Sequence, residues 1–564
     1  MTFGSIPLDQ FTDTFSTTTE LSSVALGGRI VAVSDEFFAE AFHLLLVEPA
    51  PSMKGQFGPN GALYNGWETR RHNQDHDWCI IQLGIAGTAV GFDIDTSNFN
   101  GNEAPEASVE ALYAADGDPH QKDTRWKEIL PRTPLGPNSR HLFSIAQTER
   151  INYIKLNMYP DGGIARFRVY GHVTPVYPSD RSFDLAHVSA GGRVEFVSDQ
   201  HFGVGSNLIL PGRGKNMGDG WETKRTRVKG HKDWVIIKLG AAGNLEHVEI
   251  DTAHFKGNFP ESCELHALCS DHEIDWKAQQ DEELEWILIL PRTKLGPHRQ
   301  HYFQLENVED RKFTHVRVTI YPDGGLKRVR ITGRRTDTST AMIEPSGGAM
   351  NAKLSAVPEE SDSQRTELIH AAMIPVLPLT PEAFGPFGQV LQAYGDHNAA
   401  PKGTRITLAN DGTASKFHKL SLLSSSYPAD AGATAGISIY RCKPLEEIAA
   451  DGSVNLTALE RHPDTKQAFI PMGCGPGEGL SATADKYLVV VAKNGEDDRP
   501  DLGTVRAFMA TTAQGVVYDT AVWHQPMTVL GKSLDLACVE TQIGDGSGLD
   551  CEIVRVEGIR LQVE

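Results

Sequence analysis

Two sets of residues in this sequence have the types and spacing that acid–base or metal chemistry requires. The first set surrounds two loops, 95–102 and 251–258, which share the pattern Asp-Thr-x-x-Phe-x-Gly-Asn and are each followed by arginine and histidine at matching places. Carboxylate, amide, guanidinium and imidazole groups together can bind a carboxylate through two hydrogen bonds, hydrogen-bond a urea-like group and transfer protons. The candidates are Asn102, Arg132, Glu222, Asp251, His254, Asn258, Glu261, Arg292 and His301.

The second set lies near the C-terminus. His462 and His524 stand in two segments about 60 residues apart, as in the two motifs of a cupin barrel, whose imidazoles point inward onto a metal. Neither segment contains His-x-His, so two roles stay open: ligands of a divalent ion such as nickel or manganese, or carriers of protons. Tyr518, six residues before His524, would share its face of one extended strand. Arg461 and Arg506 are candidates to bind a substrate carboxylate.

Several of these residues also have a structural interpretation. Asp251 could cap a loop, Glu222 could belong to an internal ion pair, and the Pro-Asp-Gly-Gly segments that occur twice are typical of hairpin turns. His254 stands where the first loop has Asn98, and only an imidazole carries a proton near neutrality. We therefore expect the second loop to belong to the better-equipped site.

The elements that position the first set arise from a tandem duplication. The recurring segments are Gly-Trp-Glu-Thr-[Arg/Lys]-Arg (66–71, 220–225), Asp-Trp-x-Ile-Ile-x-Leu-Gly (77–84, 233–240), Leu-Pro-Arg-Thr (130–133, 290–293) and Tyr-Pro-Asp-Gly-Gly (159–163, 321–325). Corresponding segments are about 160 residues apart, so each copy is a whole domain rather than a short solenoid repeat.

Hydrophobic patterning predicts an all-β fold. Period-two alternation over 151–158 and 314–320 is typical of antiparallel strands, and short strands between Gly, Pro and Asp turns favour two tandem jelly-roll β-sandwich domains, 1–176 and 177–335. The Ser, Thr, Pro, Gly and Glu-rich stretch 336–372 predicts a flexible linker. Residues 373–564 are again strand-rich and predict a cupin-like β-barrel, with a short helix capped by Thr380 and starting at Pro381.

Composition excludes several classes of function. The 564 residues carry a formal net charge of −20, whereas sequence-independent nucleic-acid binding needs clustered lysine and arginine. The seven cysteines form no Cys-x-x-Cys pair, which favours reduced thiols over a disulfide framework. The N-terminus lacks a signal-peptide pattern, and no uninterrupted apolar run reaches about 20 residues. We expect a cytoplasmic protein without nucleic-acid or membrane partners.

The doubled Gly-Trp-Glu-Thr-[Arg/Lys]-Arg, Asp-Trp-x-Ile-Ile-x-Leu-Gly and Leu-Pro-Arg-Thr segments, together with the Asp-Thr-x-x-Phe-x-Gly-Asn loops, closely resemble allantoicase over about residues 1–335. The resemblance implies two jelly-roll modules that hydrolyse allantoate to ureidoglycolate and urea. In that case Arg292 would clamp the carboxylate of allantoate, and His254, Glu222 or His301 would transfer protons to the departing urea.

Residues 373–564 are similar to ureidoglycolate lyase. The similarity rests on Glu-Arg-His-Pro at 460–463, Gln-Ala-Phe-Ile-Pro-Met at 467–472, Arg-Ala-Phe at 506–508 and Val-Trp-His-Gln-Pro at 522–526. It implies a cupin-like enzyme, usually dimeric, that splits ureidoglycolate into glyoxylate and urea. It also adds His418, which sits where the family carries a histidine, to the substrate-binding candidates.

Together the two resemblances imply a bifunctional purine-catabolic enzyme in which the product of the first half is the substrate of the second. A homo-oligomer is expected, as a dimer through the lyase domain. An alternative keeps the folds but makes the chain a pair of carbohydrate-binding β-sandwiches fused to a non-catalytic cupin. The missing signal peptide and unpaired thiols disfavour this alternative.

Overall fold

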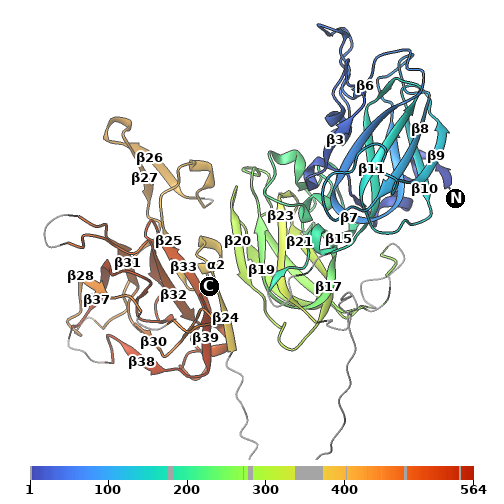
Figure 1. Ribbon diagram of the computed structural model, residues 1–564. Coiled ribbons are helices and arrows are strands. Elements are labelled where there is room, and N and C mark those ends of the chain that lie inside the picture. Colours follow the sequence, from blue (N-terminus) through green and yellow to red (C-terminus); the bar gives the residue numbers. More distant parts are fainter. Residues whose placement is uncertain are drawn as a thin grey trace, which may run out of the picture. The chain divides into compact units, whose positions relative to one another are not determined.

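The structure is a computed structural model that describes residues 3–175, 177, 182–270, 272, 274–276, 284–336, 372–401, 403–428, 430–445, 448–475, 479–544 and 548–563. Its regular elements are strands almost throughout, which confirms the all-β prediction (Figure 1). We call β1–β13 repeat 1, β14–β23 repeat 2 and β24–β39 the C-terminal domain. Residues 337–371, where the sequence predicts most of a flexible linker, lie outside the described residues.

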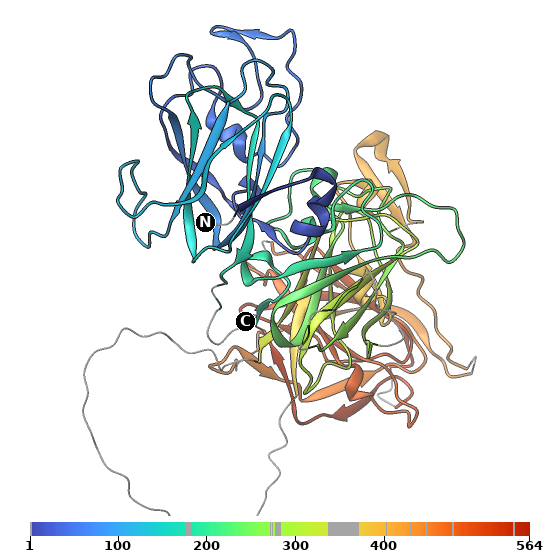
Figure 2. The same ribbon diagram turned by 90° about the vertical axis from the view of Figure 1, so that its right-hand side faces the viewer.

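The elements of repeat 1 are β1 (Phe3–Ile6), α1 (Phe11–Phe15), β2 (Thr19–Glu20), β3 (Arg29–Val33), β4 (Phe57–Gly58), β5 (Gly61–Ala62), β6 (Trp67–Glu68), β7 (Asp77–Asp95), β8 (Glu106–Leu112), β9 (Lys127–Pro134), β10 (Arg140–Ile145), β11 (Ile151–Tyr159), β12 (Gly163–Ile164) and β13 (Arg166–Val173). The long strand β7 joins two layers. Its first half pairs with β3 and β11, and its second half pairs with β10 and β13. The resulting β-sandwich can be followed in Figures 1 and 2.

Repeat 2 follows the same plan with β14 (Phe183–Asp184), β15 (Arg193–Val197), β16 (Trp221–Glu222), β17 (Asp233–Asp251), β18 (Ser262–Leu268), β19 (Ile287–Lys294), β20 (Gln300–Gln304), β21 (Phe313–Tyr321), β22 (Gly325–Leu326) and β23 (Arg328–Arg335). Here β17 is the long shared strand, next to β15, β20, β21 and β23. The predicted duplication is therefore a duplication of one sandwich.

A tryptophan in each repeat ties the loops to the core. Trp67 and Trp221 are fully buried, and each indole N–H donates to a backbone carbonyl, of Asp35 and Asp199 respectively, at 2.8 Å. Burial of an indole contributes on the order of 2–3 kcal/mol, and its one polar group is satisfied. The residue that follows, Glu68 or Glu222, is thereby held at a fixed place beside the core.

The C-terminal domain consists of β24 (Ala372–Pro378), α2 (Pro381–Phe384), β25 (Gly388–Leu391), β26 (Arg405–Ala409), β27 (Ala414–His418), β28 (Thr434–Cys442), β29 (Ser453–Asn455), β30 (Ala458–Arg461), β31 (Gln467–Pro471), β32 (Lys486–Ala492), β33 (Arg506–Thr511), β34 (Gly515–Tyr518), β35 (Trp523–His524), β36 (Thr528–Val529), β37 (Leu534–Gln542), β38 (Glu552–Arg555) and β39 (Ile559–Gln562). The short helix begins as predicted, since Thr380 Oγ1 accepts from the Ala383 amide.

Two sheets of the C-terminal domain curl around an apolar core. One sheet has the order β29-β39-β24-β33-β32-β35-β30-β38, with β36 beside β32, and the other has the order β25-β34-β31-β37-β28. Side chains from both sheets meet between them, among them Val489, Phe508, Tyr518 and Leu536. This half-barrel matches the predicted cupin-like fold. No helix in the described ranges is long and apolar enough to cross a membrane.

Candidate active sites

A glutamate and an asparagine meet in each repeat. In repeat 2, Asn258 Nδ2 donates to Glu222 Oε1 at 2.6 Å, and in repeat 1, Asn102 Nδ2 donates to Glu68 Oε1 at 2.9 Å. Burial raises the pKa of Glu68 above its usual range. The structure thus brings together two candidates of the sequence analysis, Glu222 and Asn258, that lie on a strand and in a loop 36 residues apart.

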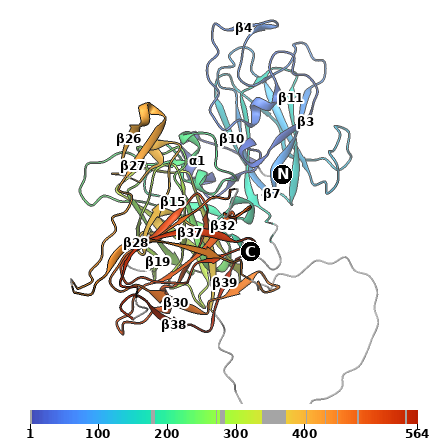
Figure 3. The same ribbon diagram turned by 90° about the vertical axis from the view of Figure 1, so that its left-hand side faces the viewer.

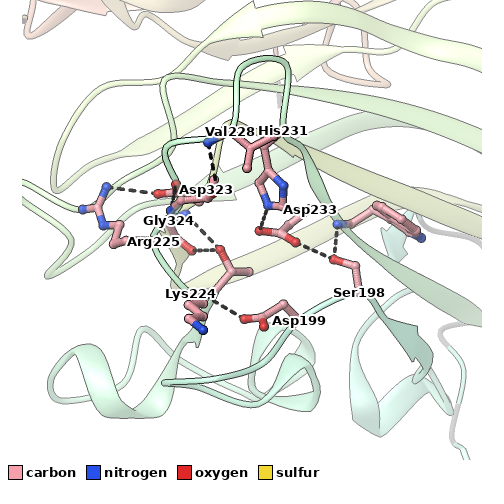
Figure 4. A network of polar contacts seen from close by, with 12 residues as sticks. Ser198, Asp199, Lys224, Arg225, Val228, His231, Asp233, Asp323 and Gly324 are labelled. Atoms are coloured by element: carbon pink, nitrogen blue, oxygen red, sulfur yellow. Dashed lines mark hydrogen bonds and ion pairs between the residues drawn. The ribbon is translucent and has the colours of Figure 1, made fainter.

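An arginine–aspartate pair lies beside each of these pairs, and the sequence analysis missed it. Asp323, nearly fully buried, accepts from Arg225 Nη1 at 3.1 Å and from the Thr226 amide at 2.9 Å (Figure 4). Arg225 Nη2 also donates to the Gly257 carbonyl at 3.3 Å, next to Asn258. The guanidinium therefore joins the Pro-Asp-Gly-Gly segment to the loop of the first set.

Repeat 1 preserves this arrangement. Asp161 accepts from Arg71 Nη1 and from the Asn73 amide, both at 3.0 Å. The Pro-Asp-Gly-Gly segment is thus more than a turn, because its aspartate organises the neighbouring loop in both copies. The detectable signal was the recurrence of an arginine three residues after each Gly-Trp-Glu glutamate, together with a recurring aspartate.

Gly324 shows why this segment needs glycine. Its φ is +137°, and a Cβ atom there would lie 2.6 Å from the Asn258 carbonyl oxygen. Only glycine adopts such a backbone readily and permits so close an approach. The turn therefore places Asn258 against Glu222.

Two other candidates have structural roles. Asp251 is fully buried, and Arg213 donates to its two oxygens at 2.7 and 2.9 Å, while the Ala253 amide donates at 2.8 Å. His301 is fully buried as well, and its Nε2 accepts from the Gly296 amide at 2.7 Å. Asp251 thus has the loop-capping role considered above, and His301 holds a turn.

His254 occupies the middle of the second loop. Its φ is 69°, the same as that of Asn98 in repeat 1, so both lie in the left-handed region. Asparagine adopts this backbone more readily than most residues, and histidine is also enriched there. The two repeats therefore share the backbone conformation at this position and differ in the side chain, which is an imidazole only in repeat 2.

The arginines of the Leu-Pro-Arg-Thr segments lie over tyrosine rings. Arg292 Cζ is 4.0 Å from the Tyr321 ring centroid and Arg292 Nε donates to Ser262 Oγ at 2.8 Å. Arg132 lies 4.4 Å above the Tyr159 ring, and its Nε donates to Glu106 at 2.7 Å. Both guanidinium groups flank the Tyr-Pro-Asp-Gly-Gly segment.

Strand register matches Glu106 with Ser262, not with Glu261. Glu106 faces Tyr159 in the sheet of repeat 1, and Ser262 faces the corresponding Tyr321 in repeat 2. Glu261 is exposed just before β18, and its amide donates to the Tyr321 carbonyl at 2.9 Å. Arg132 thus has a carboxylate partner, whereas the side-chain hydrogen bond of Arg292 within the described part of the chain goes to a hydroxyl.

A compact set of metal-ligand side chains lies in the C-terminal domain. One ligand atom each of Glu460, His462 and His524 lies within 4.8 Å of the others. Strand pairing produces part of this set, because Glu460 on β30 is opposite His524 on β35. Glu460 was not predicted from the sequence, although it stands two residues before His462.

Backbone carbonyls orient both imidazoles. His462 Nδ1 donates to the Asp550 carbonyl at 2.7 Å, and His524 Nδ1 donates to the Val522 carbonyl at 3.0 Å. Each Nε2 therefore carries a lone pair, and both Nε2 atoms are buried without a hydrogen-bond partner among the described residues. Two such nitrogens beside a carboxylate form a donor set suited to a transition metal.

Burial sets the charges in this cluster. It lowers the pKa of His462, and with the nearby charge of His462 it lowers the pKa of His524 to about 3. Burial and the charge of Glu540 raise the pKa of Glu460 to about 7. Both imidazoles are consequently neutral near pH 7, the form that binds a metal or accepts a proton.

The prediction that Tyr518 and His524 share one strand is wrong. The chain turns between them, where the Val522 amide donates to the Asp519 carbonyl, so Tyr518 ends β34 in one sheet and His524 lies on β35 in the other. The two rings nevertheless stack, with centroids 3.9 Å apart, because the sheets face each other. Packing rather than strand periodicity places Tyr518 at the site.

The remaining candidates differ in position. Arg461 is almost fully buried and donates to Glu552, Asn494 and Asp498. Arg506, by contrast, lies in one row across the sheet with Glu460 and His524, through the pairs Glu460–His524, His524–Val491 and Val491–Arg506. Residues directly opposite share a face of a sheet. Arg506 therefore faces the cluster side.

His418 lies away from the cluster. It ends β27, which pairs with β26 as a separate hairpin, and its Nε2 contacts Thr407 Oγ1 at 2.7 Å. Figures 1 and 3 show this hairpin at the opposite end of the domain from β30. The described structure thus does not bring His418 to Glu460, His462 and His524.

Comparison with known proteins supports the resemblance found for each half of the chain. The allantoicase repeat model matches residues 19–174 and 183–336, and the ureidoglycolate lyase model matches residues 371–564. A probable allantoicase of Schizosaccharomyces pombe is 50% identical over 324 residues, which cover 56% of this chain and 92% of that protein. The allantoicase of Neurospora crassa is 46% identical over 344 residues, 58% of this chain and 95% of that protein.

A solved structure gives the same result. The crystal structure of Saccharomyces cerevisiae allantoicase aligns with a TM-score of 0.52 at 39% identity, covering 59% of this chain and all of that chain. The chain therefore belongs to the allantoicase family through its two repeats and carries a ureidoglycolate lyase domain at its C-terminal end.

Proposed function

We propose that the repeats hydrolyse allantoate to ureidoglycolate and urea, and that the C-terminal domain then splits ureidoglycolate into glyoxylate and a second urea. The observation that carries this proposal is the set Glu460, His462 and His524, of which His524 is buried and the other two partly buried, in a lyase domain fused to two allantoicase repeats. Two consecutive steps on one chain would limit the loss of ureidoglycolate, which releases urea spontaneously.

For the first step we place the substrate at the loop end of repeat 2. Arg292 would bind the carboxylate of allantoate, since its face lies on Tyr321 and its hydroxyl contact leaves most donors for an anion. Glu222, held by Asn258, would accept hydrogen bonds from a ureido group. His254 supplies an imidazole in the same loop as Asn258.

Matched variants in the two repeats test this placement. Glu222→Gln and Arg292→Met should each lower the rate of urea release from allantoate by about 10²-fold or more, as expected for a lost polar contact to the reacting molecule. The corresponding Glu68→Gln and Arg132→Met show whether repeat 1 works independently. Equal loss in both repeats would refute the preference for repeat 2.

For the second step the substrate is a carbinolamide. Its C–N bond breaks as a base takes the hydroxyl proton, the carbonyl forms and an acid protonates the leaving urea nitrogen. The neutral His462 and His524 are placed for the proton transfers, Tyr518 packs on His524 to fix its ring, and Arg506 would bind the carboxylate. Glu460, with its raised pKa, can hold a proton near neutrality.

The same three side chains fit a divalent ion such as Ni²⁺ or Mn²⁺, because both orphaned Nε2 atoms and the carboxylate converge. A bound ion would polarise the substrate oxygens. Metal analysis of the purified full chain and of His524→Ala tests this independently of activity. If chelation removed no metal and left glyoxylate formation unchanged, while His524→Ala still lowered kcat by about 10²-fold, the histidines would act as proton carriers alone.

We also propose a homodimer through the C-terminal domain. β28 pairs only with β37 among the described strands, and its Ile437 and Ile439 are 73% and 58% exposed. The charge on this strand is that of Arg441, which pairs with Asp535 of β37. An open edge with exposed apolar side chains invites pairing, and antiparallel pairing with the same strand of a second copy is two-fold symmetric. Light scattering should give twice the chain mass, and Ile439→Lys should give the monomer.

A cytoplasmic location is proposed as well, and its support is that all seven cysteines are free thiols. The domain boundaries near 176, 335 and 372 remain proposals that proteolysis of the full chain would test.

A further inference from the structure

Repeat 2 contains an imidazole backed by a buried carboxylate, close to the Arg225–Asp323 pair. His231 Nε2 lies 3.1 Å from Asp233 Oδ2, and Ser198 Oγ donates to the other oxygen, Asp233 Oδ1, at 2.9 Å (Figure 4). Asp233 is only 3% exposed, whereas the His231 side chain is 32% exposed. Ser198 therefore fixes the buried carboxylate on one side, and the imidazole on its other side reaches solvent.

The hydrogen bond defines the tautomer of His231. A carboxylate accepts from Nε2–H, so Nδ1 carries the lone pair of this partly exposed ring. A buried carboxylate in this position stabilises the imidazolium that forms when Nδ1 takes a proton. His231 thus has the orientation of a general base, with Asp233 as its positioning residue.

The surrounding loop links this dyad to the proposed allantoate site. Asp233 begins β17 opposite Ile320, three residues before Asp323, which accepts from Arg225 and Thr226. The Val228 amide donates to Thr226 Oγ1, and the His231 amide donates to the Val228 carbonyl. One loop, 225–233, therefore carries both the arginine that reaches the Asn258 loop and the imidazole.

Repeat 1 has the carboxylate without the imidazole. Asp77 corresponds to Asp233 and accepts from Ser34 Oγ at 2.7 Å, but the position of His231 is taken by Asp75, whose side chain is 88% exposed. The nearby His76 contacts Asp75 Oδ1 at 3.1 Å and lies over the Tyr159 ring. The serine–aspartate hydrogen bond is common to both repeats, whereas a histidine at the position of His231, in contact with that aspartate, occurs in repeat 2 alone.

We propose that His231 is the proton carrier of allantoate hydrolysis in repeat 2, an inference that rests on the function proposed above. The C–N bond between the central carbon and one ureido nitrogen breaks, and a C–O bond to water forms. Nδ1 takes one proton from the water, and the imidazolium returns one proton to the departing urea nitrogen. The Nε2 proton stays on His231 throughout, hydrogen-bonded to the Asp233 carboxylate, so the enzyme is unchanged after each turnover.

The test uses the full chain and two substrates. His231→Gln can still donate a hydrogen bond to Asp233 but carries no proton, so urea release from allantoate should fall by about 10²-fold or more. Glyoxylate formation from ureidoglycolate, measured on the same preparation, should stay at the wild-type rate. The matched control His76→Gln in repeat 1 should leave both rates unchanged.

Chemical rescue separates proton transfer from a structural role. His231→Ala should regain allantoate turnover when free imidazole is added, because the site is open to solvent, whereas a purely structural loss would not respond. Wild-type urea release by His231→Gln, or a folded His231→Ala that imidazole does not rescue, overturns the inference. If the wild-type chain released no urea from allantoate, the proposed function itself would fail, and the inference with it.

Discussion

The two arginines considered for the lyase carboxylate site should respond to substitution in opposite ways. Arg461 is 4% exposed, bonds Glu552, Asn494 and both oxygens of Asp498, and lies 4.8 Å above the Trp523 ring. These contacts leave no donor aimed at the face of Glu460 and His524. Replacement by methionine keeps much of the apolar stem while removing the charge.

The expected loss of stability in Arg461→Met follows from the solvent exposure of the acidic partners of Arg461. The side chains of Asp498 and Glu552 are 71% and 40% exposed, so water can replace their lost bonds. The cost therefore stays below the roughly 3–5 kcal/mol of a fully buried pair, at about 2–3 kcal/mol. At about 2–4 °C per kcal/mol for a domain of this size, Tm should fall by about 4–12 °C.

Calorimetry and steady-state kinetics on the full chain distinguish the two arginines. Arg461→Met should lower the Tm of the C-terminal domain while the KM for ureidoglycolate at 20 °C changes less than about threefold. Arg506→Met should leave Tm nearly unchanged and raise KM by about 10-fold or more, because a charged hydrogen bond to substrate contributes about 1.5–3 kcal/mol. An increase of KM in Arg461→Met at constant Tm would contradict the reasoning.

Three further results are expected. Cleavage of the chain near Gly348 should leave two active pieces, and an N-terminal piece unable to hydrolyse allantoate would show that the lyase domain completes that site. Burial alone would raise the pKa of Glu195, but hydrogen bonds from His315 and Trp276 outweigh it and hold the pKa at about 2. The ionised carboxylate therefore stabilises the fold fully at pH values above its ordinary pKa of 4.5, and this contribution is lost as pH falls towards 2. The difference in Tm between wild type and Glu195→Gln should therefore shrink over that range, and a constant difference would contradict it. Asp323→Asn should loosen Arg225 and slow urea release from allantoate, with Asp161→Asn as the matched comparison.

Periodicity and turn residues were sufficient to predict the strands, but not how deeply they are buried. The stretch 151–158 alternates like a half-buried strand, yet β11 is buried along most of its length, including Lys155 and Asn157. Lys155 is tolerated because Glu110 and the Gln121 carbonyl bind its ammonium group. Polar residues on the second face of a central strand are hidden by loops, which period-two patterns do not encode.

Candidate site residues could be singled out where one motif carried them. His462 and His524 stood out through their segments, and Glu222 and Asn258 through their doubled loops. Glu460 and Asp323 were missed because their contacts depend on a partner from another element, a facing strand or an arginine in a loop. His231 was missed because its contact with Asp233, two residues on, depends on the conformation of the loop. Arg461 was misleading for a related reason, since the partners that occupy its guanidinium lie 33 to 91 residues away.

By itself the sequence determined the duplication, the all-β class and the identity of both halves, because long recurring motifs and alternating hydrophobicity are properties of the chain. The tertiary structure alone decided which polar side chains meet. Strand register set Glu460 opposite His524, the facing of two sheets stacked Tyr518 on His524, and loop packing backed His231 with Asp233. Glu460 and His524 are distant along the chain, whereas the pairs Tyr518–His524 and His231–Asp233 are near in sequence and depend on the conformation of the turn or loop that holds them. The free energy of these contacts exists only once the apolar cores have brought the strands together.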